Sequence, residues 1–279
     1  MRNLIFIITI AIFAMTFSCK NSKYTYPETR KDTVVDNYFG TKVLDEYRWL
    51  EDDNSEETKK WVDAQNKVTF DYLEEIPFRE KLKKRISEVM NYEKYSTPFK
   101  KAGRYFYFKN DGLQNQSVFY TLKNLSDEPE ILINPNKLSP DGTTALSNMA
   151  ISKNGKYFAY SISKSGSDWN EILIRNIETK KDLNEKIKWV KFSMISWYKN
   201  GFFYSRYPAP KKGDELTSSN INHAVYYHRI GTQQSEDKLI FDNKKHPQFM
   251  YRATVSEDDK YIFISESKAQ AEMEFTLKT

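Results

Sequence analysis

Residues 155–161 read Gly-Lys-Tyr-Phe-Ala-Tyr-Ser, a turn glycine followed by a short run rich in aromatic residues. Similar stretches occur at Gly103–Phe108 (GRYFYF), Gly201–Ser205 (GFFYS) and Asp259–Ser265 (DKYIFIS). The four copies begin at residues 103, 155, 201 and 259, so their spacings are 52, 46 and 58 residues. A repeat of about 50 residues indicates that one supersecondary unit is used several times along the chain.

Each copy is accompanied by further segments with a period of two. Short apolar segments precede the last three copies, a third strand follows all four, and a fourth strand follows the first three, as at Lys238–Phe241. The preceding segments are 149–152, 194–197 and 253–256, and the third strands are 117–122, 171–177, 224–230 and 274–278. Four short strands per unit predict the blades of a β-propeller, which bury their faces by stacking on one another. A β-sandwich with irregular loops is the alternative architecture.

The repeat stops in the third strand of its fourth unit, close to Thr279. A propeller must close into a ring to cover its outermost blade faces. We therefore expect a mainly β chain that forms an incomplete β-propeller over residues 93–279, and we expect the chain to be a fragment or a truncated reading frame.

Residues 31–92 have a different, helical pattern. Residues 31–50 are expected to be irregular, with a turn at Gly40. Asn54 followed by Glu57 fits the start of a helix, and Pro77 fits the first turn of a second one. The apolar positions at helical spacing are Trp61, Ala64, Val68 and Tyr72 in the first helix and Phe78, Leu82, Ile86 and Val89 in the second.

The N-terminus has the pattern of an export signal. Arg2 precedes an apolar run, Leu4–Phe17, of 14 residues, which is shorter than the ~20 needed to span a bilayer. Ser18 directly before Cys19 resembles a bacterial lipobox, after which the cysteine thiol carries lipid. We expect residues 1–18 to be a signal peptide, Cys19 to be lipidated and residues 19–30 to be a polar tether. The chain would then be a lipoprotein anchored to a membrane of a bacterial cell envelope, or periplasmic if the signal is an ordinary cleaved one and the cysteine carries no lipid.

Composition excludes several other classes of protein. Charged residues make up 29% and the net charge is +5, spread along the chain, so no nucleic-acid partner is expected. A single cysteine excludes a disulfide framework and a cysteine-rich metal site. The three histidines, His223, His228 and His246, lack zinc-site spacing and are expected to be ordinary surface or strand residues. We expect no metal and no cofactor.

Four stretches point to a family. Asp45–Asp52 (DEYRWLED) is similar to a signature of prolyl oligopeptidase-type serine peptidases, with Glu46 where proline is usual. Gly112–Ser117 (GLQNQS), Ser165–Trp169 (SGSDW) and Tyr226–Asp237 (YYHRIGTQQSED) resemble the prolyl oligopeptidase branch more specifically. The resemblance extends from about Tyr26 to about Ile264.

The resemblance implies a two-part enzyme that cleaves short peptides after proline. An α/β-hydrolase domain with a Ser-Asp-His triad is capped by a seven-bladed propeller that restricts entry. In this chain, residues 31–92 would belong with the hydrolase domain, and 93–279 would form about four of the seven blades. The sequence holds no G-x-S-x-G motif, and the family's triad would lie beyond Thr279. We therefore assign no catalytic residue and expect this chain alone to be inactive; its partners would be short proline-containing peptides and the C-terminal hydrolase domain.

Two substrate-pocket positions follow from the same resemblance. Phe192 and Met250 match apolar residues of the family's propeller face, where they would supply contact area to the peptide. Packing in a blade core is the alternative role for both. The family's pocket cysteine would fall near Gln270, but the local sequence departs from the family pattern, so that role is not transferred.

A different class of function is also compatible with the composition: a non-catalytic propeller displayed on the membrane as an interaction surface. The apolar stripes of the two predicted helices argue against it, because they require a partner domain. A related peptidase of another specificity is a second alternative.

Overall fold

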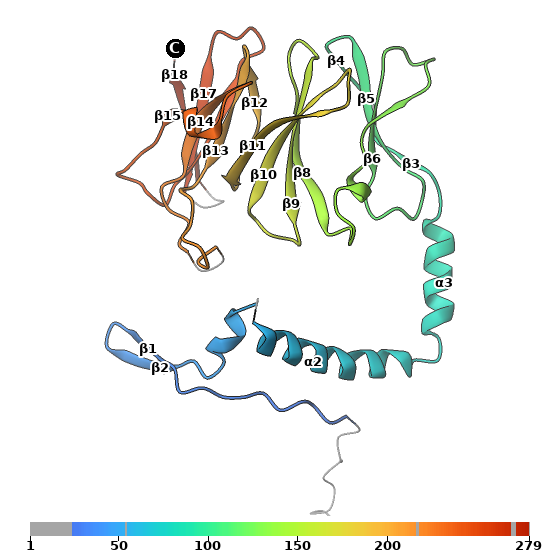
Figure 1. The fold of residues 1–279 in the computed structure, drawn as a ribbon, viewed down its shortest axis with the longest axis vertical. Helices are drawn as coiled ribbons and strands as arrows, with labels where there is room; N and C mark the ends of the chain where they lie inside the picture. Colours follow the sequence, from blue (N-terminus) through green and yellow to red (C-terminus); the bar gives the residue numbers. More distant parts are fainter. Residues whose placement is uncertain (1–23, 54, 216–217, 269–271, 279) are drawn as a thin grey trace, which may run out of the picture. The chain divides into compact units, whose positions relative to one another are not determined.

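The computed structural model describes residues 24–53, 55–215, 218–268 and 272–278 (Figure 1). By its internal contacts the chain divides into two compact units, with the division between Glu88 and Val89. The domain boundaries expected from the sequence, including that between residues 92 and 93, stay predictions. Residues 1–18 and Cys19 lie outside the described residues.

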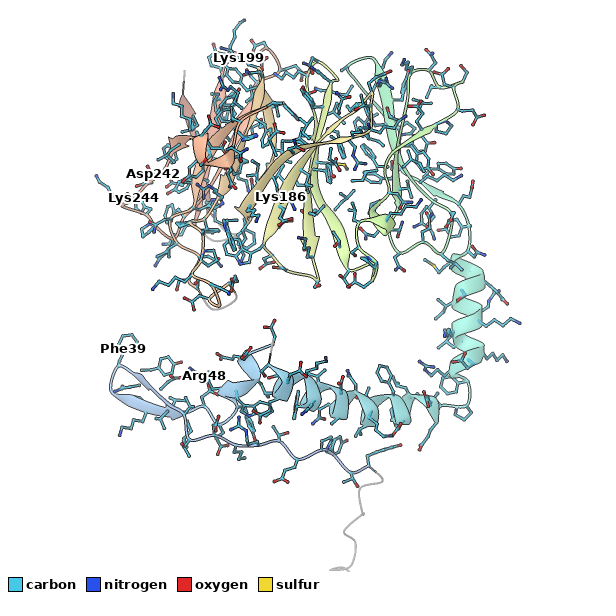
Figure 2. The ribbon with its side chains drawn as sticks, in the orientation of Figure 1. Phe39, Arg48, Lys186, Lys199, Asp242 and Lys244 are labelled. Carbon is cyan, nitrogen blue, oxygen red and sulfur yellow. The ribbon has the colours of Figure 1, made fainter. Side chains whose placement is uncertain are left out.

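The first unit contains a hairpin that the sequence did not predict. Strands β1 (Val35–Tyr38) and β2 (Thr41–Leu44) pair antiparallel, and both turn residues, Phe39 and Gly40, have positive φ angles of 53° and 94°. This combination is the two-residue turn that fits the twist of a hairpin. Phe39 lies fully exposed at its tip (Figure 2).

Two helices follow, close to their predicted positions. After a short 3-10 helix, η1 (Arg48–Glu51), come α2 (Glu56–Glu74) and α3 (Arg79–Met90). The first helix is capped by Ser55, whose hydroxyl accepts a hydrogen bond from the Thr58 amide at 3.0 Å, and the predicted cap Asn54 lies outside the described residues. The second begins two residues after Pro77. No helix among the described residues is long and apolar enough to cross a membrane.

The predicted apolar stripe of these helices is largely exposed. Tyr72, Phe78 and Leu82 have exposed fractions of 49%, 63% and 51%. Ion pairs hold the DEYRWLED stretch that precedes the helices. Arg48, which is labelled in Figure 2, pairs with Asp36 of β1 and with Asp45. The signature therefore fixes the hairpin to the start of η1.

The second unit consists of three antiparallel sheets of five, eight and three strands, and the eight-stranded sheet comprises two four-stranded parts joined only through the Val190–Arg206 pair. The strands therefore form four blades, which confirms the propeller-type prediction. Figure 1 shows them side by side in chain order. Blade 1 comprises β3 (Lys94–Tyr95), β4 (Phe99–Lys101), β5 (Arg104–Asn110), β6 (Val118–Leu122) and β7 (Glu130–Ile133), and blade 2 comprises β8 (Thr144–Ile151), β9 (Tyr157–Lys164), β10 (Asn170–Asn176) and β11 (Asp182–Val190). Blade 3 comprises β12 (Ser196–Tyr198), β13 (Gly201–Arg206), β14 (Ala224–Arg229) and β15 (Lys238–Phe241), and blade 4 comprises β16 (Met250–Val255), β17 (Ile262–Lys268) and β18 (Glu272–Lys278).

The repeated motif marks one turn in each blade: between β4 and β5, β8 and β9, β12 and β13, and β16 and β17. Gly103 and Gly155 have φ angles of 78° and 69°, and in the fourth copy Asp259 keeps a φ of 61°. At Gly201 the requirement for glycine is steric. A Cβ atom there would lie 2.1 Å from the carbonyl oxygen of His228, so its small size permits the close approach of β13 to β14.

The apolar core lies between the blades. Blades 1 and 2 meet through Phe119 and Phe158, whose ring centroids are 5.4 Å apart, and both side chains are fully buried. Further interfaces are formed by Ile172, Trp197 and Phe202 between blades 2 and 3, and by Phe203, Tyr251 and Ile264 between blades 3 and 4. This stacking of successive sheets is the propeller arrangement and not that of a two-sheet sandwich.

Two leucines on equivalent outer strands test this core. Leu132 on β7 is fully buried, whereas Leu239 on β15 is 47% exposed. We expect Leu132→Ala to lower the free energy of unfolding by about 2–5 kcal/mol, because it leaves a cavity in the interface between blades 1 and 2. Leu239→Ala should cost less than about 1 kcal/mol. Urea unfolding followed by circular dichroism measures both, and equal losses would contradict the assignment of the core.

Candidate substrate-contact site

One end of the blades carries the connection in which Phe192 lies and the connection that directly precedes Met250. The strands alternate in direction, so the segments 165–169, 191–195, 207–223 (described over 207–215 and 218–223) and 242–249 all join strands at this same end (Figure 1). We call these four segments the connection face. Direct contacts link them: the Asn222 amide donates to the Pro247 carbonyl at 2.6 Å.

Phe192 lies in the short connection between β11 and β12. Its φ angle is 53°, and its side chain is 42% exposed. Met250 is the first residue of β16 and is half-buried. Phe192 thus does not fill a blade core, the alternative role that its sequence permits. The roles of both residues in substrate contact stay predictions.

The connection that carries Phe192 is held by hydrogen bonds from three blades. Asn148 of blade 2 donates its side-chain amide to the Ser193 carbonyl at 3.0 Å. The Ser205 amide of blade 3 donates to the Ser193 hydroxyl at 2.8 Å. Arg252 of blade 4 donates its Nε–H to the Phe192 carbonyl at 3.4 Å. The segment therefore has a defined conformation although it contributes to no β-ladder.

His223 adds two hydrogen bonds from a buried side chain. The Tyr251 amide donates to its Nδ1 at 2.9 Å, so Nδ1 is unprotonated and the proton must lie on Nε2. Nε2 then donates to the Lys191 carbonyl at 3.0 Å. One neutral imidazole thus connects the residue before Phe192 to the residue after Met250.

Burial keeps this imidazole neutral. His223 is 1% exposed, and desolvation lowers its pKa to about 4. The hydrogen bond to the Lys191 carbonyl acts in the opposite direction, and the positive charge of Arg252 lowers the pKa further. The ring of Tyr207 packs on the imidazole, with centroids 4.6 Å apart.

A cation and several aromatic rings surround Phe192. The Lys191 ammonium lies 5.5 Å from the centroid of the Phe192 ring and 4.9 Å from that of Trp169, and 3.6 Å from an Asp168 carboxylate oxygen. Trp169 meets Trp189 edge to face at 5.6 Å. These groups offer apolar and cation–π contacts to a ligand.

Beside the Trp169–Trp189 pair lies a cavity of about 320 Å³. Ile162 completes its apolar lining, and Lys164 and Glu171 stand at its margin, where they form an ion pair at 3.1 Å. No cluster of three or more histidine, cysteine or acidic side chains suited to hold a metal occurs in the part of the chain that the structure describes.

The prediction of ordinary surface or strand histidines was incomplete. His223 and His228 are both buried, at 1% and 0% exposure, and only His246 of the three is exposed. His228 Nδ1 contacts a buried Asp237 carboxylate at 2.7 Å. Sequence reasoning missed His223, Arg252 and Asn148 as supports of the site, because their partners lie 32, 60 and 45 residues away.

Stacked antiparallel blades with an exposed aromatic residue in their connections define a β-propeller domain. The family of prolyl oligopeptidase N-terminal β-propeller domains matches residues 26–278, and the chain belongs to the prolyl oligopeptidase family. It is 48% identical over 277 residues to a prolyl endopeptidase of Elizabethkingia meningoseptica, an alignment that covers 97% of this chain and 39% of that protein. It is 35% identical over 299 residues to a prolyl endopeptidase of Dictyostelium discoideum, covering 87% and 39%.

The solved structures agree with this assignment. Prolyl oligopeptidase B of Galerina marginata, bound to a 25mer macrocyclization substrate, matches with a TM-score of 0.77 and 32% identity, over 91% of this chain and 39% of that one. This chain therefore spans about two fifths of the length of the relatives that it matches.

The buried imidazole makes stability depend on pH. Between pH 6.5 and about 4 the unfolded chain binds a proton at His223 that the folded chain does not, so this contribution to stability is present above pH 6.5 and is lost as pH falls. By pH 5 we expect the wild type to have lost about 2 kcal/mol more than His223→Gln, which has no titratable group at this position. Urea unfolding of both proteins at pH 7 and pH 5 measures the difference. Parallel losses would show that the folded chain does not hold His223 neutral.

Proposed function

We propose that this chain is the N-terminal part of a serine endopeptidase that hydrolyses short peptides on the carboxyl side of proline, and that it supplies the substrate-gating propeller. The proposal is supported chiefly by the family match over residues 26–278. The exposed Phe192 on the connection face agrees with it. No observation on the described residues favours the alternative of a non-catalytic interaction protein.

The chemistry would divide between two domains. A serine of the hydrolase domain would attack the carbonyl carbon of the proline residue, and its proton would pass through histidine to the departing amine of the next residue. Water then hydrolyses the acyl-enzyme ester and regenerates the serine. The sequence here contains no G-x-S-x-G elbow, so this chain would bind and admit the peptide but would not cleave it.

Phe192 and Met250 are the proposed apolar contacts to the peptide. An aromatic ring that is 42% exposed still has apolar surface to bury, and each 40 Å² of apolar area removed from water is worth about 1 kcal/mol.

Peptide binding tests this role. We expect a fluorescein-labelled peptide with one proline between apolar residues to bind the chain and to remain uncleaved by mass spectrometry. Phe192→Ala should weaken binding about fivefold, which corresponds to about 1 kcal/mol of lost apolar contact. Met250→Ala should act in the same direction. Fluorescence anisotropy gives the dissociation constants.

The matched control is Phe263→Ala. Phe263 lies on β17 with a similar exposure of 39%, and its replacement should leave the affinity unchanged. Equal affinities of all these variants would remove Phe192 and Met250 from the site. Hydrolysis of the peptide by this chain would require a nucleophile within it.

We also propose that the chain is exported and is anchored to a bacterial envelope membrane by lipid on Cys19. The support is Ser18-Cys19 after the apolar run that begins at Leu4. In a bacterial host fed with radiolabelled palmitate, the wild type should take up label and sediment with membranes, whereas Cys19→Ser should do neither. An unlabelled wild-type protein in the soluble fraction would contradict lipidation.

A further inference from the structure

Phe192 has a backbone conformation that its own side chain disfavours. A φ of 53° is in the left-handed region, where Cβ crowds the backbone and bulky residues are rare. Such a conformation persists only where the surroundings determine it. Phe192 follows directly after β11 and has no ladder partner, so side chains must provide the restraint.

The restraint consists of a separate donor for each carbonyl of the segment. The carbonyls of Lys191, Phe192 and Ser193 accept from His223, Arg252 and Asn148, respectively. The three donors come from three different blades. Rotation of the Phe192 peptide units into a relaxed conformation would break these bonds, and in the case of His223 it would leave a buried N–H without its acceptor.

We propose that His223 is the positioning residue for Phe192: its imidazole fixes the Lys191–Ser193 segment in the left-handed conformation and ties it to β16, so that Phe192 and Met250 are presented together to the peptide. Arg252 and Asn148 support the same conformation. This inference rests on the proposed function, because it assigns a role to the peptide contacts named there.

The choice of His223 follows from its use of both ring nitrogens. One nitrogen donates to Lys191 and the other accepts from the Tyr251 amide, so the two segments are linked through a single rigid ring. Arg252 and the ring of Tyr207 also belong to its surroundings. A second proton on the ring would remove the acceptor of the Tyr251 amide and would place a positive charge near that of Arg252.

A conservative variant separates hydrogen bonding from the mere presence of a side chain. Glutamine carries one donor and one acceptor on a planar group, so His223→Gln can keep both bonds. His223→Leu fills the same space but can make neither. His246→Leu is the matched control, because His246 is an exposed imidazole on the same face that stacks on Phe249 with centroids 4.6 Å apart.

Amide hydrogen exchange of the full 279-residue chain at pH 7 is the direct test. In His223→Leu, peptides that cover 189–195 and 249–253 should exchange about tenfold faster than in wild type, because the Tyr251 amide loses its acceptor and the Lys191 carbonyl loses the bond that restrains its segment against local opening. In His223→Gln and His246→Leu both should stay within about twofold of wild type. Peptides from β9 should be unchanged throughout, which shows that the blades remain folded.

The result that overturns the proposal is an unchanged 189–195 segment in His223→Leu, or a glutamine variant that behaves like the leucine variant. If His223→Leu fails to fold, Arg252→Met serves instead, because Arg252 is exposed. That variant should raise exchange at 189–195 and leave 249–253 unchanged. A 189–195 segment that stays fully protected in Arg252→Met would equally overturn the network.

Binding of the labelled proline peptide then separates this inference from the proposed function. If both hold, His223→Leu weakens binding as much as Phe192→Ala does, and His223→Gln binds like wild type. If wild type binds the peptide but His223→Leu binds equally well, the positioning role is wrong and the proposed function stands. If wild type binds no proline peptide, the proposed function is wrong, and the exchange pattern alone decides whether His223 holds the segment.

Discussion

The stacking of aromatic and aliphatic side chains between neighbouring sheets is the constraint on which this protein depends. A blade of three to five short strands has two faces and too few residues to cover either by itself. Phe119 of blade 1 therefore packs on Phe158 of blade 2, and Tyr157 of blade 2 packs on Trp197 of blade 3 at 6.3 Å. These contacts set how the blades follow one another, and hence where the connections at their ends lie.

The connection face is a consequence of that stacking. Because successive strands alternate in direction, all links between blades and all links between middle strands meet at one end. A ladder of backbone bonds cannot position these links, so their polar groups need other partners. Side chains from the neighbouring blades supply them, as Asn148 and Arg252 do for the Phe192 segment. The packing of three blades thus determines where the exposed Phe192 lies.

Much of the fold could be predicted from local sequence, because the repeat indicates the strands and turns of each blade. The turn glycines at 103 and 155 and the period-two aromatic runs are local signals, and the strands lie where these signals indicate. The β1–β2 hairpin gave no such signal, since its strands bury almost nothing and hence show no apolar alternation. Ser55 caps the first helix, and the sequence alone could not select it, because serine and asparagine suit that role equally well.

The candidate site was less accessible to sequence reasoning. Phe192 and Met250 were found through the family resemblance and not through any pattern of their own. His223 could not be recognised as buried, because its environment is made by Lys191 and Tyr251, which are distant in the chain. The positive φ of Phe192 is likewise set by tertiary hydrogen bonds, and nothing in the neighbouring residues indicates it.

Blade 3 shows how polar groups complement the apolar stacking. At the connection face it places His223 between its neighbours, whereas at the opposite end His228, Asp237 and Tyr204 form a second buried group, with the tyrosine hydroxyl donating to Asp237 at 2.7 Å. Burial of such groups is costly unless they are paired, so each pairing selects one arrangement of the loop that it holds. Apolar stacking specifies that the blades assemble, and it tolerates small shifts between sheets. The directional bonds at either end of blade 3 do not tolerate such shifts, and this is why an exposed residue such as Phe192 can have a fixed position on a face formed by loops.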